Sequence, residues 1–148
     1  MDTHLQTHLE ALVGERHPET APTKLRHVEA YLAEAMRRLG LAVSVQTFEA
    51  LGGLYRNVIG TIRPVGLVQE VILPEPAPLV VAAHYDSVSG SPGADDNASG
   101  LAVLLEAARL LRIAAVPREI RFVGFCLEEE DLLGSLAYAS ALRAQGQT

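Results

Sequence analysis

The chain contains 148 residues, of which 49% are apolar and 20% are charged, a composition that predicts one globular domain with a single core. Its formal net charge of −6, without a basic patch or stripe, argues against a nucleic-acid partner. The single cysteine, Cys126, excludes a disulfide framework, and neither a signal peptide nor an apolar run of roughly 18–20 residues is present, so we expect a cytoplasmic protein without a membrane span.

The first half of the sequence predicts two helices followed by a β-hairpin. A short helix is expected over residues 3–13. Apolar residues at helical spacing predict a longer one over residues 22–39, which begins at a proline and ends before a glycine. The stretches Ala42–Ala50 and Tyr55–Ile62 read as two strands joined by a Gly-Gly turn. Residues 63–78, which hold four prolines, are expected to be a connector.

The second half of the sequence predicts alternating strands and helices. Residues 79–83 form a continuous apolar run, as expected for a strand buried on both faces, and residues 120–126 predict another such strand. Helices are expected over residues 98–112 and 132–144. This order implies a right-handed crossover between two parallel strands, and therefore an α/β fold.

Ionisable residues follow both predicted buried strands. His84-Tyr85-Asp86 follows the first strand, and Glu128-Glu129-Glu130-Asp131 follows the second, while Asp95-Asp96 lies at the start of the crossover helix. Because ligands of open α/β sheets bind at the carboxyl ends of the strands, we expect these groups to meet at one edge of the sheet. So many carboxylates repel one another unless a cation lies among them. A mixed set of histidine and carboxylates suits zinc, and also manganese or cobalt.

Three motifs follow one another along the chain: His84-x-Asp86-Ser87, then Gly93-Ala94-Asp95-Asp96-Asn97-Ala98-Ser99-Gly100, then Glu128-Glu129 with Leu132-Leu133-Gly134-Ser135. In this order and at these separations they resemble the co-catalytic two-zinc aminopeptidases of the bacterial leucyl aminopeptidase and aminopeptidase Y type. Arg16-His17-Pro18 and Asn57-Val58-Ile59-Gly60 extend the resemblance upstream. It implies a three-layer zinc-exopeptidase-like fold with a mixed, centrally parallel sheet. Residues 1–148 would be the N-terminal portion of one catalytic domain, truncated after its first half.

The resemblance also implies roles for individual residues. His84, Asp95 and Glu129 would be metal ligands, with Asp95 bridging two zinc ions. Glu128 would be the general base. A carboxylate that is not a ligand can take a proton from water whose pKa the metals have lowered, which agrees with this assignment. Asp86 lies two residues past His84 and is expected to hold its other ring nitrogen.

Two features depart from the family pattern. The family usually has glycine where this chain has Asp131, and it needs an aspartate and a histidine further along than Thr148. By that pattern each zinc would have only two of its three protein ligands, so we expect the chain by itself to bind zinc weakly and to lack appreciable activity. We also expect association into a homo-oligomer through an unpaired strand edge. Asp96 is expected to cap a helix or to be solvated in a loop, and Glu130 to be a solvated surface residue.

Three functions remain open from the sequence. The leading one is metal-dependent removal of N-terminal residues from a peptide substrate. The second is glutaminyl cyclase chemistry on the same fold, since those enzymes also carry a His-Tyr-Asp-Ser stretch, although they resemble this chain less over residues 95–100 and need one zinc. The third is a non-enzymatic relative that serves as an interaction module. The residue preference of an aminopeptidase cannot be read from these residues.

Overall fold

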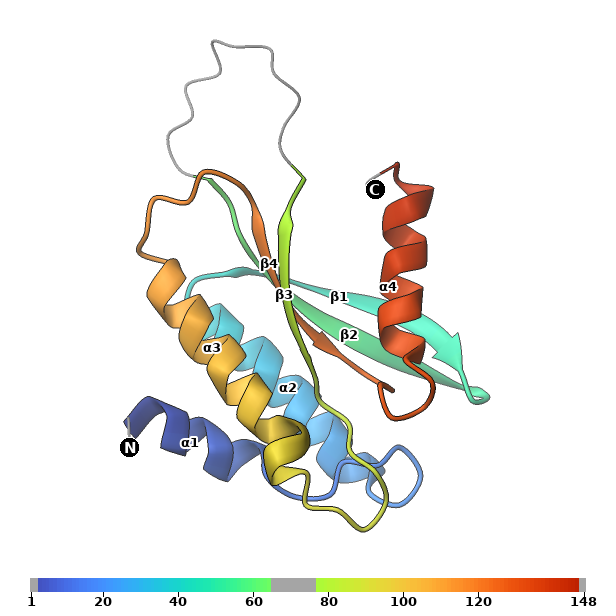
Figure 1. The fold of residues 1–148 in the computed structure, drawn as a ribbon. Coiled ribbons are helices and arrows are strands. Elements are labelled where there is room, and N and C mark those ends of the chain that lie inside the picture. Colours follow the sequence, from blue (N-terminus) through green and yellow to red (C-terminus); the bar gives the residue numbers. More distant parts are fainter. Residues whose placement is uncertain (1–2, 65–76, 147–148) are drawn as a thin grey trace.

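In the computed structural model, residues 3–64 and 77–146 are described, and they form three layers (Figure 1). A four-stranded sheet lies between two helical layers, as expected. Helices α2 and α3 cover one face of the sheet with α1 packed beside α3, and α4 lies on the other face. The elements are α1 (Thr3–Leu12), α2 (Pro22–Arg38), β1 (Ala42–Ala50), β2 (Gly53–Ile62), β3 (Leu79–His84), η1 (Ala94–Ser99), α3 (Gly100–Leu111), β4 (Ile120–Phe125) and α4 (Leu133–Ala144). None of the helices in the described residues is long and apolar enough to cross a membrane.

The sheet is mixed, with strand order β1-β2-β4-β3. β1 and β2 form the predicted antiparallel hairpin, β2 pairs antiparallel with β4, and β4 pairs parallel with β3, so both predicted pairings are confirmed. The parallel pair lies at one side of the four strands and not at their centre. Most of the predicted connector, residues 65–76, lies outside the described residues.

Strand β3 differs from the expectation of a strand buried on both faces. Leu79 and Val80 are 48% and 37% exposed, and only Ala83 and His84 at its carboxyl end are buried. The reason is position: β3 is an edge strand among the described residues, and α4 packs on β1 and β2. A continuous apolar run therefore does not distinguish a central strand from an edge strand here.

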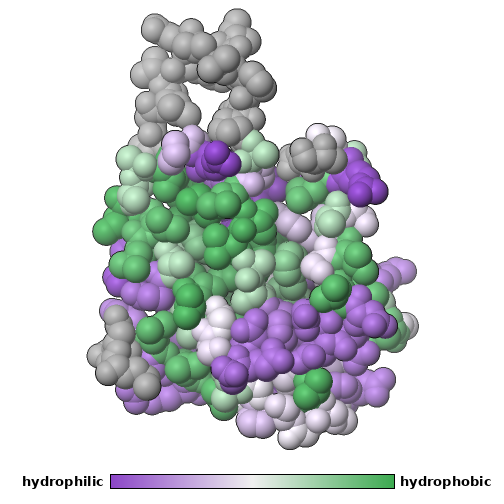
Figure 2. Space-filling view, in the orientation of Figure 1, coloured by the Kyte–Doolittle hydropathy of each residue, from purple (hydrophilic) through white to green (hydrophobic). Residues whose placement is uncertain are grey.

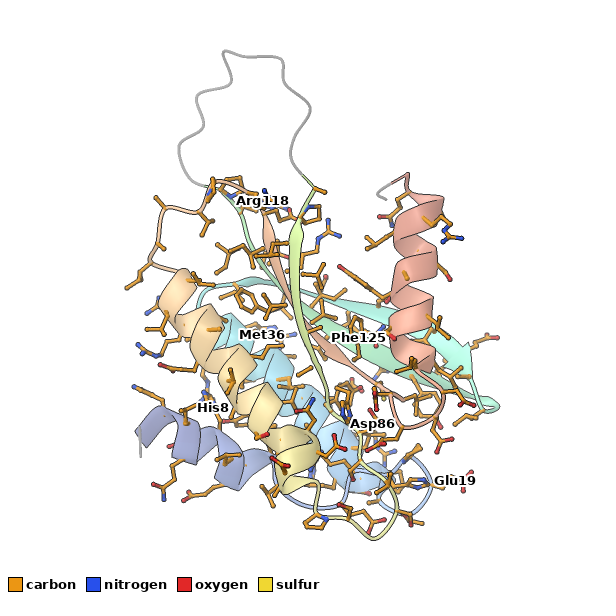
Figure 3. All side chains as sticks on the ribbon, in the orientation of Figure 1. His8, Glu19, Met36, Asp86, Arg118 and Phe125 are labelled. Atoms are coloured by element: carbon orange, nitrogen blue, oxygen red, sulfur yellow. The ribbon has the colours of Figure 1, made fainter. Side chains whose placement is uncertain are left out.

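The main core lies between α2, α3 and the sheet. Met36 of α2 and Phe122 of β4 are fully buried, and Figure 3 shows Met36 directed toward the strands. Gly60 of β2 makes this approach possible, because a Cβ atom there would come within 2.7 Å of the Met36 sulfur and 2.9 Å of Leu41 Cδ2. Close packing of α2 on β2 thus depends on the absence of a side chain at position 60.

Asn57 of β2 connects the end of β4 to the start of α4. Its side-chain oxygen accepts a hydrogen bond from the peptide N–H of Cys126 at 3.1 Å, and its side-chain nitrogen donates to the carbonyl of Gly134 at 2.8 Å. A Cβ atom on Gly134 would lie 2.0 Å from the carbonyl oxygen of Cys126, so only glycine fits there. The buried amide therefore fixes both ends of the loop that carries Glu128 and Glu129.

Candidate metal centre

The carboxyl ends of β3 and β4 lie side by side because the two strands are parallel and in register. His84 is opposite Phe125, and the peptide N–H of Tyr85 donates to the Phe125 carbonyl at 2.8 Å. Asp86 therefore leaves the sheet close to the backbone of Glu128, and Figure 3 shows Asp86 just beyond the end of β3. In Figure 2 hydrophilic surface gathers over this end of the sheet. The predicted meeting of ionisable groups at one sheet edge is confirmed for these segments.

Three side chains from separate segments come together at this edge. His84, Asp96 and Glu129 each offer a ligand atom, and these atoms all lie within 4.8 Å of one another. His84 Nε2 lies 2.9 Å from Asp96 Oδ1. The His84 side chain is buried, whereas that of Asp96 is 74% exposed, so the group opens to solvent on the Asp96 side.

Asp96, and not Asp95, is the aspartate in this cluster. Asp95 is exposed, and its carbonyl accepts a hydrogen bond from the Ser99 hydroxyl at 2.7 Å. The helical turn η1 is interrupted at Asp96 and Asn97, whose backbone angles are not helical. The structure thus brings together the predicted ligands His84 and Glu129 but replaces Asp95 by its neighbour. Asp96, expected to cap a helix or be solvated, is indeed exposed to solvent and in addition contacts His84.

Asp86 organises the two glutamates through their backbone. Its Oδ1 accepts the peptide N–H of Glu128 at 3.1 Å and its Oδ2 accepts that of Glu129 at 3.0 Å. The Asp86 side chain is fully buried, so these hydrogen bonds are shielded from water. Its expected partner, His84 Nδ1, lies 3.6 Å from Oδ1, which is an ionic contact longer than a hydrogen bond. Asp86 is therefore a clamp on the loop after β4, a role that sequence spacing did not indicate.

Glu128, the expected general base, lies at the margin of the cluster. Its Oε2 is 3.7 Å from His84 Nε2, and its side chain is 38% exposed. It belongs to no ligand triplet among the described residues. A carboxylate that is near the ligands and open to solvent can exchange a proton with water.

The next two acidic residues, Glu130 and Asp131, lie outside the cluster. Glu130 Oε1 lies 3.5 Å from His17 Nε2, so Glu130 is not simply solvated but contacts the segment between α1 and α2. Asp131 is exposed and has a φ of 57°, in the left-handed region that glycine adopts without steric cost and aspartate tolerates. This backbone conformation gives a physical reason for the glycine that the family usually has there.

The electrostatics of the cluster favour a bound cation. Burial alone lowers the pKa of His84, but the carboxylates of Asp86, Glu128 and Asp96 outweigh it and raise the pKa to about 9. The pKa of Glu129 is raised by burial and by the negative charge of Asp96. A divalent ion at this point offsets the repulsion between carboxylates. One imidazole nitrogen with two carboxylates is a donor set that zinc accepts, so these residues fit zinc.

Metal binding should strengthen with pH because zinc and a proton compete for His84. With a pKa of about 9, the metal-free imidazole is protonated at pH 7 and must lose that proton to coordinate. We expect the apparent zinc affinity to rise steadily from pH 6 to pH 8.5 and proton release to accompany binding. Titration calorimetry in buffers of different ionisation enthalpy measures both. An affinity that is constant over this range would contradict the assignment of His84 as a ligand.

Comparison with known proteins identifies the family. The family described as "Peptidase family M28" matches residues 57–148. "Aminopeptidase YwaD" of Bacillus subtilis is 45% identical over 87 residues, which cover 59% of this chain and 18% of that protein. The Escherichia coli protein YfbL is 33% identical over 142 residues, covering 85% of this chain and 41% of that protein. The chain thus spans less than half the length of either relative.

Solved structures agree in fold. A zinc aminopeptidase from Bacillus subtilis superposes with a TM-score of 0.81 at 20% identity, over 93% of this chain and 64% of that one. A glutaminyl cyclase from Porphyromonas gingivalis gives a TM-score of 0.66 at 32% identity, over 85% and 44% of the two chains. The family match covers more than half of this chain and every residue of the cluster. The chain therefore belongs to peptidase family M28.

Proposed function

We propose that the protein is a zinc-dependent aminopeptidase that removes N-terminal residues from peptides. The observation that carries the proposal is the convergence of His84, Asp96 and Glu129 within 4.8 Å, with Glu128 beside them. Membership of a peptidase family and relatives named aminopeptidases support this substrate class.

Asp96 would be the ligand that two zinc ions share. Its exposed carboxylate has two oxygens, one of which already faces His84 Nε2. One zinc would be held by His84 and Asp96 and the other by Asp96 and Glu129. Bound zinc lowers the pKa of water and polarises a carbonyl group.

Three residues of this chain would carry out proton transfer, positioning of the loop and metal ligation. Glu128 takes a proton from the attacking water and passes it to the amine that leaves. Asp86 fixes the peptide groups of Glu128 and Glu129, so that the base and the neighbouring ligand keep their separation. His84 serves as a neutral ligand once its proton has been displaced.

Glutaminyl cyclase chemistry is a second candidate, favoured by solved cyclase structures at 29% and 32% identity. One experiment separates the two activities. A form of the protein that turns over a leucine anilide is incubated with zinc and a peptide that begins with glutamine, and the masses of the products are measured by mass spectrometry. An aminopeptidase adds water and releases the first residue, whereas in a cyclase reaction the N-terminal amine attacks the glutamine side-chain amide, ammonia leaves, and the peptide keeps its length. We expect the first outcome, abolished by a chelator, and ammonia release without a shortened peptide would overturn the proposal.

We also propose that copies of the chain associate through the edge of β3. Its outer side pairs with no strand among the described residues, and Leu79 and Val80 are partly exposed there. An unpaired edge with apolar side chains is a template for pairing with another strand. Light-scattering chromatography should show an average mass that grows with protein concentration. Replacing Val80 by lysine should reduce this growth in mass. A monomer at all concentrations would contradict this expectation.

A further inference from the structure

Arg16 is a fully buried arginine whose guanidinium donates hydrogen bonds to backbone carbonyls. It lies between α1 and α2. Its guanidinium donates to five carbonyl oxygens at distances from 2.7 to 3.1 Å, those of Leu12, Gly14, Tyr85, Pro92 and Gly93. A buried charge is costly unless its environment compensates it, so an arginine with this many fixed acceptors has a specific structural task.

The five carbonyls belong to three segments, two of which carry residues of the metal centre. Leu12 ends α1 and Gly14 follows it, Tyr85 lies between His84 and Asp86, and Pro92 and Gly93 precede Asp96. One planar group therefore sets the distance between the end of β3 and the loop that carries the proposed bridging ligand. The peptide N–H of Arg16 adds a bond to the Ser87 hydroxyl at 2.9 Å on the same loop.

Gly93 shows how tightly the guanidinium and this loop fit together. Its φ is +54°, and a Cβ atom there would lie 2.3 Å from Arg16 Nη2 and 2.7 Å from the carbonyl of Asp96. The Gly93 carbonyl accepts from Arg16 Nη2 at 2.9 Å and from the peptide N–H of Ala98 at 3.1 Å. Arg16 thus acts on the turn that contains Asp96 through a single carbonyl group.

The charge of Arg16 also faces the centre. Burial lowers its pKa, while attraction to Asp86, Asp96 and Glu129 raises it. The guanidinium stays protonated in proteins. It therefore places a fixed positive charge near three carboxylates. Because arginine is not a metal ligand, this charge does not occupy the position of an ion.

We propose that Arg16 is a positioning residue for the metal centre, holding the His84 and Asp96 segments at the separation that one ion can span. The inference rests on the proposed metal-binding function. It predicts that metal binding depends on the planar geometry of the Arg16 guanidinium and not only on its charge. Lysine carries the same charge but has at most three donors in a different arrangement.

The test uses Co²⁺ as a spectroscopic probe with the Arg16→Lys and Arg16→Met variants of this chain. We expect Arg16→Lys to weaken Co²⁺ binding by about 10- to 100-fold and to change its visible absorption spectrum, as is typical when a residue that orients ligands is altered. Arg16→Met should weaken binding at least as much. Arg38→Lys is the matched control, because Arg38 is an exposed arginine paired with Glu34 on α2. The Co²⁺ affinity and absorption spectrum of this variant should be unchanged.

The possible outcomes separate the two hypotheses. Folded Arg16 variants with unaltered affinity and spectrum overturn the positioning role alone, whereas an original chain that binds no Co²⁺ overturns the metal centre and this inference with it. If neither Arg16 variant folds, as judged by circular dichroism, Ser87→Ala replaces them. It removes the acceptor of the Arg16 peptide N–H and should weaken Co²⁺ binding by about 2- to 10-fold. No change in that variant would also overturn the proposal.

Discussion

Replacing Glu128 by glutamine should lower turnover by about 10²- to 10⁴-fold while the zinc content stays the same. Glutamine keeps the size of the side chain but cannot accept a proton at neutral pH. Glu128 lies beside His84 without belonging to the ligand triplet, and its peptide N–H stays clamped by Asp86 whatever the side chain. The loss should therefore fall on kcat and not on metal affinity.

This prediction is tested in a form of the protein that turns over a leucine anilide. The two measurements are kcat and the zinc content by atomic emission. Glu130→Gln is the matched control, because it makes the same chemical change two residues further on, where the carboxylate faces His17. Its turnover should stay close to the original. Loss of zinc from the Glu128→Gln protein would show that Glu128 is a ligand and would shift both glutamate roles by one residue.

Replacing Asp96 by asparagine should weaken zinc binding by more than about 100-fold, since even residues that only orient ligands contribute about 10- to 100-fold. Asparagine loses the charge and one of the two oxygen donors that a bridging ligand needs. The Asp96 side chain is 74% exposed, so the substitution leaves the core unchanged and the protein should stay folded.

Asp95→Asn provides the internal control for Asp96→Asn. The two aspartates are adjacent, both are exposed, and only Asp96 lies within 4.8 Å reach of His84 and Glu129. Competition with a chelating dye should give near-original affinity for Asp95→Asn. The reverse result, with Asp95→Asn losing zinc and Asp96→Asn keeping it, would restore Asp95 as the ligand.

Periodicity and resemblance predicted most of the architecture. β1 has the predicted bounds, α2 ends within one residue of its expected end, and the parallel pairing of β3 with β4 follows from the chain order. The bounds of helices and strands follow from the local pattern of apolar residues. The parallel pairing follows from the preferred right-handed connection of a strand, a helix and a second strand. The exposure of Leu79 and Val80 was not predicted, because it depends on which neighbours a strand has.

The site was predicted only where position along a strand determines it. His84 is the last residue of β3 and Glu129 follows the end of β4, and the carboxyl ends of parallel strands meet on one side of the sheet. Between Asp95 and Asp96 the choice depends on backbone angles within a broken helical turn, which residue identity does not reveal. Arg16 and Asn57 were visible only as members of motifs, because their roles come from carbonyl and N–H groups contributed by distant segments.

The clamp that Asp86 places on the Glu128 and Glu129 peptide groups has a consequence for the order of folding. It joins residues 42 and 43 positions apart, so it forms only after the β3–α3–β4 crossover has closed a long loop. Because the proposed ligands come from both ends of that crossover, the unfolded chain offers no preformed chelate, and zinc held by them would bind the native state more tightly than the unfolded one. We therefore expect metal capture to be a late event in refolding, and a dye that reports free zinc would time the docking of β3 against β4.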